Sequence, residues 1–282
     1  MPPIMWTAAA ETDGNFRTFG GAGSDSYTGG AKNDGFYFGP GHFDSQDFVN
    51  GGAGTNDQLG LDGDYTLTLG TNITNVEVVV MIQKPGGSLN TYNLSTVDAF
   101  VAAGQTMTIY GVQVVNPITF NGSAETNGAF RVFGGLGADI ITTGAGNDSI
   151  LGGAGADILT GGGGADTFIY NAASESTGAG FDTLLGFDFA VDRIDLPNTV
   201  DAYQTLLTGR LDAATFDANL TAVMGGLTAG TAILFTPNSG SYAGQHFVIV
   251  DGNGVAGYQA GAAGGAKGGG GGPVGPRPGL IS

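Results

Sequence analysis

The chain has 282 residues, of which 55 are glycine and only 12% are charged. So much glycine carries a backbone entropy cost that argues against an ordinary helical or α/β domain and favours a repetitive fold. The formal net charge of −17, with eight basic residues, makes nucleic acid and anionic membranes poor partners and cations good ones. The absence of cysteine excludes a disulfide scaffold and cysteine-ligated zinc.

The N-terminal residues, MPPIMWTAAAETDG, contain neither a basic region nor an apolar run of signal-peptide length. The most apolar stretch, VEVVVMI at 76–82, is far too short to span a bilayer. We therefore expect no membrane insertion, and any export to proceed without a cleaved N-terminal signal peptide.

The chain contains a long internal repeat. Residues 11–34, ETDGNFRTFGGAGSDSYTGGAKND, align without gaps to residues 125–148, ETNGAFRVFGGLGADIITTGAGND, at a displacement of 114 residues. In the second copy, Glu125, Asn127 and Arg131 predict a structural turn that leads into the next segment. The first copy opens a segment at 11–60 for which we predict a degenerate N-terminal β-roll.

Three acidic residues of this N-terminal segment are candidate metal ligands: Asp25, Asp34 and Asp57. Lys32 places a positive charge beside Asp34. The stretch GGAGTNDQLG at 51–60 has one extra residue, so either Asn56 or Asp57 could face a metal ion. The insertion GPGHFDSQDFVN at 39–50 is expected to interrupt the stacking of the segment.

Residues 61–133 show β-branched and apolar alternation separated by Gly, Asn and Pro, which predicts short strands joined by turns. The candidate strands are YTLTLG, ITNVEVVVMI, TMTIYG and PITFNG. We predict that this segment is a β-solenoid connector.

Residues 134–170 contain four nonapeptides: GGLGADIIT, TGAGNDSIL, GGAGADILT and GGGGADTFI. Each predicts a six-residue turn and a three-residue strand centred on a large apolar residue. Two successive nonapeptides can form one turn of a flattened helix, whose strands stack into two parallel sheets around an apolar core. We therefore predict an all-β parallel β-roll or β-solenoid. The strand centres are Ile141, Ile150, Leu159 and Phe168.

The same repeats place an aspartate at every ninth position, with glycine at the second and fourth positions of each turn. Glycine permits positive φ, which lets a turn aim several carbonyl oxygens at one point. The predicted metal-binding residues are Asp139, Asp148, Asp157, Asp166, Gly135, Gly137, Gly144, Gly146, Gly153, Gly155, Gly162 and Gly164.

Stacking would place Asp139 above Asp157 on one edge and Asp148 above Asp166 on the other. Carboxylates at the strand spacing of about 4.8 Å repel one another unless a cation lies between them. Calcium suits best, because it accepts six to eight oxygen ligands, backbone carbonyls included, in a tolerant geometry. Magnesium demands stricter octahedral order, and zinc and copper prefer nitrogen or sulfur ligands.

These nonapeptides resemble the repeats of the RTX, or hemolysin-type calcium-binding, family. The resemblance extends to residues 20–37 and to residues 165–197, which are similar to the segment that caps the roll of serralysin-type proteases. Residues 247–261, FVIVDGNGVAGYQAG, resemble the C-terminal strands of such proteins. The resemblance implies a parallel β-roll, calcium-dependent folding, and export by type I secretion machinery to the cell surface or the medium of a Gram-negative bacterium.

Residues 171–260 are predicted to be a C-terminal capping and secretion-type region. A short helix is expected within 211–226, and strands at TAILFTP and GQHFVIVDG. The glycine- and proline-rich residues 261–282 predict a disordered tail. The helix face would be lined by Leu211, Ala214, Phe216, Leu220 and Val223. Four acidic residues of this region are expected to be solvated turn residues, with a capping calcium site as the alternative: Asp182, Asp188, Asp192 and Asp195.

The sequence contains no H-E-x-x-H and no G-x-S-x-G motif, and its only histidines, His42 and His246, fall in a predicted loop and a predicted strand. We find no catalytic constellation and predict a non-enzymatic, secreted calcium-binding protein. Two alternatives remain open: the C-terminal piece of a larger secreted enzyme or toxin, and a calcium-dependent surface-layer or adhesive protein.

Overall fold

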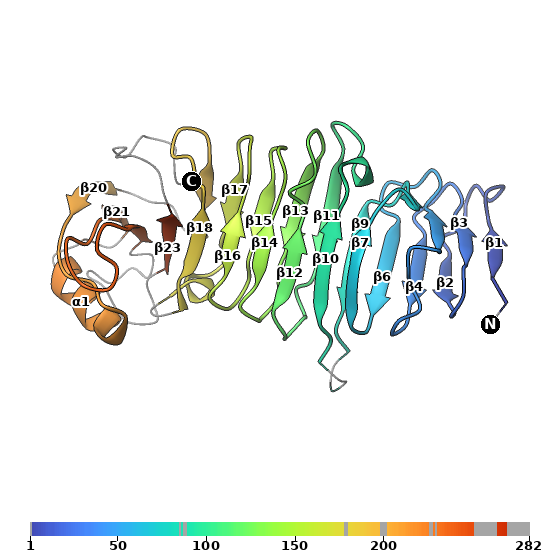
Figure 1. The fold of residues 1–282 in the computed structure, drawn as a ribbon. Coiled ribbons are helices and arrows are strands. Elements are labelled where there is room, and N and C mark those ends of the chain that lie inside the picture. Colours follow the sequence, from blue (N-terminus) through green and yellow to red (C-terminus); the bar gives the residue numbers. More distant parts are fainter. Residues whose placement is uncertain are drawn as a thin grey trace.

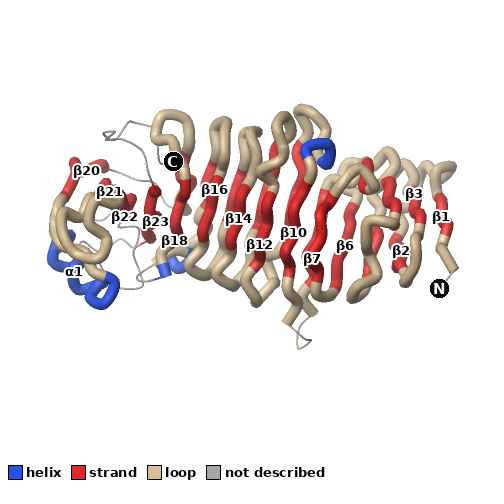
Figure 2. The backbone as a smooth tube through the Cα atoms, viewed as in Figure 1, coloured by secondary structure: helices blue, strands red, loops and turns tan. Residues whose placement is uncertain are grey.

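The computed structural model of the protein describes residues 2–84, 86, 89–177, 180–197, 202–225, 228, 230–250 and 264–269. This part of the chain is a parallel β-solenoid that ends in a small C-terminal cap (Figure 1). Turns and loops join the stacked strands along both edges of the solenoid (Figure 2). The predicted all-β fold class is therefore confirmed.

One side of the solenoid is a single sheet, which we call the front sheet. Its strands are all parallel and follow the chain from the N-terminal end to the cap. They are β2 (Arg17–Gly20), β4 (Gly35–Phe38), β6 (Gln58–Asp62), β9 (Val78–Ile82), β11 (Thr106–Tyr110), β13 (Ala129–Phe133), β15 (Ser149–Leu151), β17 (Thr167–Ile169) and β19 (Arg193–Asp195).

The opposite side consists of two sheets, because the chain starts a new one at β7. The first comprises β1 (Met5–Thr7), β3 (Ser26–Thr28), β5 (Phe48–Asn50) and β8 (Ile73–Thr74). The solenoid part of the second, which we call the back sheet, comprises β7 (Tyr65–Leu69), β10 (Tyr92–Thr96), β12 (Ile118–Asn121), β14 (Ile140–Thr142), β16 (Ile158–Thr160) and β18 (Asp182–Leu185).

The apolar core lies between these sheets, and the nonapeptides supply it as predicted. Ile141 pairs with Leu159 across β14 and β16, and Ile150 with Phe168 across β15 and β17. All four side chains are at most 1% exposed, so the strand centres predicted from the sequence are confirmed. The same core continues toward the N-terminus through Tyr27, Phe36, Val49, Leu59, Val79, Leu94, Ile109, Phe120 and Val132.

The middle segment also has the predicted strands, which are β7, β8, β9, β11 and β12. Strand β10 is not among the predicted strands, because its outward residues Asn93 and Ser95 are poor strand formers. Its inward residues Tyr92 and Leu94 are nevertheless buried. The insertion at 39–50 does not interrupt the stacking, because β5 at its end pairs with β3.

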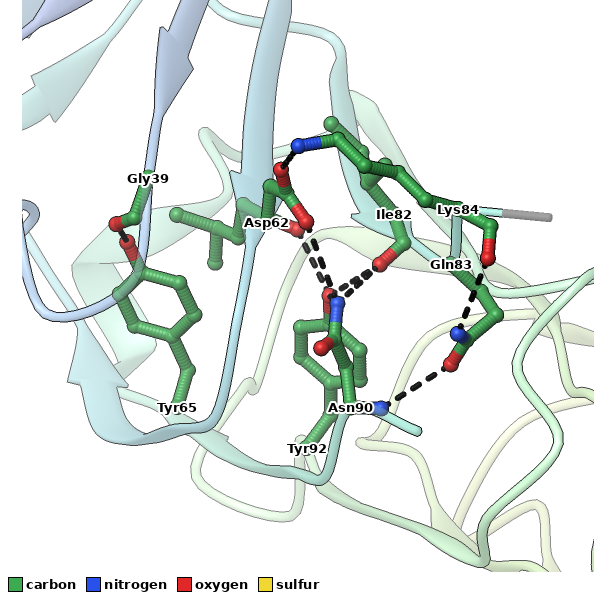
Figure 3. A network of polar contacts seen from close by, with 9 residues as sticks. Gly39, Asp62, Tyr65, Ile82, Gln83, Lys84, Asn90 and Tyr92 are labelled. Carbon is green, nitrogen blue, oxygen red and sulfur yellow. Dashed lines mark hydrogen bonds and ion pairs between the residues drawn. The ribbon is translucent and has the colours of Figure 1, made fainter. Parts of the chain in front are cut away.

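A polar network fixes the edge at which β6 and β9 lead into the back sheet (Figure 3). The Tyr92 hydroxyl lies 2.7 Å from the carbonyl oxygens of both Leu61 and Ile82. The Asn90 amide donates to the Ile82 carbonyl (2.7 Å) and the Asp62 carboxylate (3.3 Å), and Lys84 pairs with that carboxylate. These bonds tie two successive turns together, the one that contains β6 and the one that contains β9 and β10.

The cap extends the back sheet beyond β18 and has a small apolar cluster of its own. Its strands are β23 (Gly264–Gly269), β22 (His246–Val250), β21 (Thr231–Phe235) and β20 (Ala202–Leu207). Strand β22 runs antiparallel to both β21 and β23. The predicted strands at 231–237 and 244–252 are thus present as β21 and β22. Among the described residues, 3₁₀ turns lie at Asp98–Phe100, Ala173–Glu175 and Ala213–Thr215.

The predicted short helix is α1 (Phe216–Met224). Phe216 and Leu220 are buried as predicted, but Ala214 is exposed, because the helix begins after it and a 3₁₀ turn precedes it. Met224 completes the buried face instead. No helix in the described part is long and apolar enough to cross a membrane.

The prediction of a disordered tail is wrong for residues 264–269. This glycine-rich stretch forms β23, which pairs with both β18 and β22 through its backbone. A strand held by backbone hydrogen bonds between two others needs no large side chains of its own, and composition alone does not reveal it. The rest of the predicted tail lies outside the described residues.

Adjacent isoleucines in β14 provide a matched test of the core. Ile141 is fully buried, whereas Ile140, on the same strand, is 47% exposed. Ile141→Ala should lower the free energy of unfolding by about 2–5 kcal/mol, since it opens a cavity, and Ile140→Ala should change it by less than about 1 kcal/mol. Denaturant unfolding of both variants at the same calcium concentration measures the difference. Equal losses would contradict the inward orientation of Ile141.

Candidate metal centre

Each predicted aspartate of the nonapeptides ends a turn and lies two residues before a buried apolar strand centre. This spacing places the carboxylates in two stacks, one along each edge of the solenoid. Asp139 and Asp157 belong to the stack that precedes the back-sheet strands, which we call the back edge. Asp148 and Asp166 belong to the stack that precedes the front-sheet strands, the front edge.

Backbone hydrogen bonds link successive turns through these carboxylates. On the back edge, the Asp139 amide donates to Asp157 Oδ1 (2.8 Å) and the Asp157 amide to Asp182 Oδ1 (2.9 Å). On the front edge, the Asp148 amide donates to Asp166 Oδ1 at 2.9 Å. The predicted stacking of Asp139 on Asp157 and of Asp148 on Asp166 is therefore present.

Burial strongly perturbs these acids. All four nonapeptide aspartates are at most 2% exposed, and burial raises the pKa of Asp139 to about 6 and those of Asp157 and Asp166 to about 7. The neighbouring carboxylate of the stack adds to the rise at Asp157 and Asp166. The ionised side chains thus occupy an environment that lacks compensating positive charge.

No basic side chain supplies that charge in the described part. Its two ion pairs, Lys84–Asp62 and Arg210–Asp212, lie away from the stacked carboxylates. Asp157 Oδ2 and Asp57 Oδ2 are buried and have no hydrogen-bond partner. A buried carboxylate oxygen without a partner costs free energy that a bound cation would recover.

The donor set of the two edges fits calcium better than it fits a transition metal. Among the described residues, no three His, Cys, Asp or Glu side chains come together as a metal site. A cation between two stacked turns would therefore take one or two carboxylates and complete its coordination with backbone carbonyls, which calcium accepts readily. Direct ligation by the individual predicted residues stays a prediction.

The eight predicted glycines form vertical pairs between turns. A Cβ on Gly153, Gly155, Gly162 or Gly164 would lie 2.0–2.3 Å from the carbonyl oxygen of the glycine one turn earlier. The backbone turns are therefore in direct contact, and any side chain would separate them. The paired glycines are Gly135 with Gly153, Gly137 with Gly155, Gly144 with Gly162, and Gly146 with Gly164.

Positive φ, the predicted reason for these glycines, occurs in only half of them. Gly153, Gly155, Gly162 and Gly164 have φ between +96° and +130°. The glycines of the first two nonapeptides do not have positive φ, and close approach explains them instead. A Cβ on Gly135, for example, would lie 2.4 Å from the Val114 carbonyl oxygen.

The candidate metal ligands of the N-terminal segment occupy places equivalent to those of the nonapeptide aspartates. Asp25, Asp34 and Asp57 are buried, and the Asp34 amide donates to Asp57 Oδ1 at 2.5 Å. Asn56 is exposed, so Asp57 is the residue that faces the stack. Lys32 is exposed and makes no ion pair in the described part.

Four further acids belong to the same stacks: Asp47 and Glu77, which were not predicted, and Asp182 and Asp192, for which a calcium site was the alternative prediction. Asp25 donates its amide to Asp47 Oδ1, Asp57 to Glu77 Oε2, and Asp166 to Asp192 Oδ1. Asp182 and Asp192 are buried, so the expectation that they are solvated is wrong, whereas Asp188 is exposed as expected. The signal common to all of them is an acid two residues before a buried apolar residue, as in Asp47–Val49, Glu77–Val79, Asp182–Leu184 and Asp192–Ile194.

The two copies of the long internal repeat, residues 11–34 and 125–148, begin with the same turn structure. Glu125 Oε1 accepts the backbone N–H groups of Thr126, Asn127 and Gly128, and Glu11 Oε1 accepts those of the three residues that follow it. The predicted turn at Glu125 and Asn127 is therefore present. Arg131 lies beyond this turn on β13, with its guanidinium 5.0 Å from the centre of the Phe133 ring.

Comparison with known protein families supports this assignment for part of the chain. Residues 133–168 match the RTX calcium-binding nonapeptide repeat, in four copies. These residues are therefore calcium-binding repeats of the RTX type, as the sequence resemblance indicated. A search of the curated proteins found no match.

Alanine substitutions at two glycines of the repeats test whether close contact between turns is what requires glycine. Gly153→Ala should destabilise the calcium-loaded chain by about 1–3 kcal/mol, because its φ is +96° and its Cβ would lie 2.2 Å from the Gly135 carbonyl oxygen. Gly163→Ala, whose Cβ would meet nothing closer than 3.7 Å, should be neutral or stabilising by up to about 1 kcal/mol. Thermal unfolding compares the two, and a tolerated Gly153→Ala would contradict the close stacking of turns.

Stability of the metal-free chain should fall as pH rises from about 5 to about 8. Burial raises the pKa of Asp157, Asp166 and Asp182 from 3.8 to about 7, 7 and 8, so the folded chain binds more protons than the unfolded chain in this window. The melting temperature of metal-depleted protein at several pH values measures this slope. Asp182→Asn should flatten it, and exposed Asp188→Asn should not; a melting temperature that rises with pH would contradict the argument.

Proposed function

We propose that this chain is a secreted calcium-ion-binding protein whose β-roll folds when it binds calcium outside the cell. The RTX repeats at 133–168 establish the calcium-binding character. The observation that carries the folding part of the proposal is the buried, unpartnered carboxylate oxygen of Asp157 in a stack without basic residues. Such a stack opposes folding until a cation neutralises it.

Calcium then acts on the folding equilibrium by mass action. A site that exists only in the folded chain stabilises it by about 1.4 kcal/mol when calcium is tenfold above the dissociation constant, and several sites add. Dissociation constants of about 10⁻⁴ to 10⁻³ M, typical of extracellular modules, leave the sites empty at cytosolic calcium and filled at millimolar calcium. The residues that would hold the ions are the stacked aspartates and the carbonyl groups of the paired glycines.

This switch suits export through type I secretion machinery, which is the partner that we propose besides calcium. A chain kept loose by repulsion between its own carboxylates can pass through a narrow conduit and fold only after release. In this proposal the protein is non-enzymatic and works in the medium or at the cell surface.

The proposal predicts a cooperative gain of β-sheet signal when calcium is added to metal-depleted protein. Far-UV circular dichroism should show the transition at sub-millimolar to millimolar calcium and not with magnesium. The double variant Asp148→Asn, Asp157→Asn removes one charge from each edge and should shift the midpoint at least about tenfold upward, which corresponds to about 1.4 kcal/mol.

Asp64→Asn and Asp98→Asn serve as the matched control, because both side chains are carboxylates that accept hydrogen bonds from the next turn on an exposed edge. They should leave the midpoint within about twofold of the parent. A chain that is fully folded in chelator and indifferent to calcium would refute calcium-coupled folding. Export is tested separately, by expressing the chain in a Gram-negative host with and without a type I apparatus and measuring its appearance in the medium.

A further inference from the structure

The two broad faces of the solenoid differ in a way that calcium binding does not explain. Outward-facing positions of the back sheet are mostly small and polar in β7, β10 and β12, with Thr66, Asn93 and Thr119 in one register row. Later strands add aliphatic residues such as Ile140 and Ile158. No outward position of these strands, nor of β14, β16 and β18, holds an aromatic residue or an arginine.

The front sheet presents a straight aromatic row on its outer face. Cross-strand pairing aligns six outward-facing positions in six successive strands, four of which are aromatic. At a strand spacing of about 4.8 Å the row is about 24 Å long. Its members are Phe19, Tyr37, Gly60, Val80, Tyr110 and Phe133.

Several rings of this row are accessible, and one lies flat on the sheet. Phe19 is 77% and Tyr110 is 41% exposed, and their rings contact those of Tyr37 and Phe133 at centroid distances of 5.9 and 5.5 Å. A Cβ on Gly60 would lie 2.3 Å from the half-buried Tyr37 ring, so this ring covers the glycine. Exposed rings arranged in this way form a flat apolar platform.

Two of the eight basic residues of the chain, Arg17 and Arg131, lie beside this platform, each two residues before a member of the aromatic row. Arg193 belongs to the same register row of the front sheet as these two and lies three strands beyond the end of the platform. All three are exposed and belong to neither of the two ion pairs of the described part. In a chain with a net charge of −17, this is a local site of attraction for anions.

We propose that the outer face of the front sheet binds a linear acidic polysaccharide. The apolar C–H face of a sugar ring packs on an aromatic ring, and a polymer of such rings matches a row of them. Arginine pairs with carboxylates through two parallel hydrogen bonds, which suits uronate groups along the polymer. The net charge of −17 opposes any acidic partner at long range, so the proposal assigns the attraction to the arginines of this face.

Calorimetric titration of the full chain in millimolar calcium tests the proposal. The probe is hyaluronan oligosaccharides, in which uronate and N-acetylglucosamine alternate. Neutral chitin oligosaccharides and poly-L-glutamate serve as comparisons for the sugar ring and the charge alone. We expect hyaluronan oligosaccharides to bind at least about tenfold more tightly than either comparison.

The double variant Tyr110→Ala, Arg131→Gln should weaken hyaluronan binding at least about tenfold, while its circular dichroism in calcium stays that of the parent. The matched control Thr66→Ala, Arg210→Gln removes one exposed back-sheet side chain and one exposed arginine outside the platform, and should leave binding within about twofold. Absence of binding, equal binding of poly-L-glutamate, or an unaffected double variant would each overturn the proposal. So would self-association by light scattering that the double variant abolishes, because the face would then be an interface between copies.

Discussion

The structure depends on one repeated interaction, the hydrogen bond from the backbone amide of one turn to the buried aspartate carboxylate of the next. It holds the turns in register along both edges. It also buries an ionisable group that, in the part of the chain that the structure describes, forms no ion pair with a basic side chain. Every carboxylate in the stack therefore contributes a structural hydrogen bond and an electrostatic penalty together. A divalent cation would remove the penalty and leave the hydrogen bond, and this is the physical basis of the calcium-coupled folding that we propose.

Much of this arrangement follows from the sequence, because a strict period of nine fixes which residues share an edge. Ile141 and Leu159 had to face the core if Asp139 and Asp157 shared an edge, and the structure has both pairs. Asp47 and Glu77 were not predicted, and for Asp182 and Asp192 a calcium site was only the alternative, because the spacing of all four breaks the period. Each nevertheless keeps the short-range pattern of an acid before a buried residue. The pattern of an acid two residues before a buried residue is therefore kept where insertions lengthen the turns and the nine-residue period is lost.

The structural roles of the glycines in the nonapeptides were only partly predictable from the sequence. Positive φ can be anticipated from a turn motif, and it occurs at Gly153 and Gly162. Contact between Gly135 and the Val114 carbonyl depends on the distance between two neighbouring turns, and the sequence of one turn does not determine that distance. The strand β23 was unpredictable for a similar reason, since its glycines are ordered by partners on either side and not by their own side chains.

The middle of the solenoid differs from its two acidic ends. Between them, exposed Asp64 and Asp98 bond to the next turn from the solvent side, and the strands are mostly four or five residues long, where those of the nonapeptides have three. Solenoid stability is a sum over neighbouring turns, so each part can be gained or lost in sequence. In the calcium-coupled folding that we propose, the middle nucleates without metal and ordering propagates outward in both directions as ions bind. The ordered length of the solenoid, and with it its reach, would then be set by the calcium concentration around it.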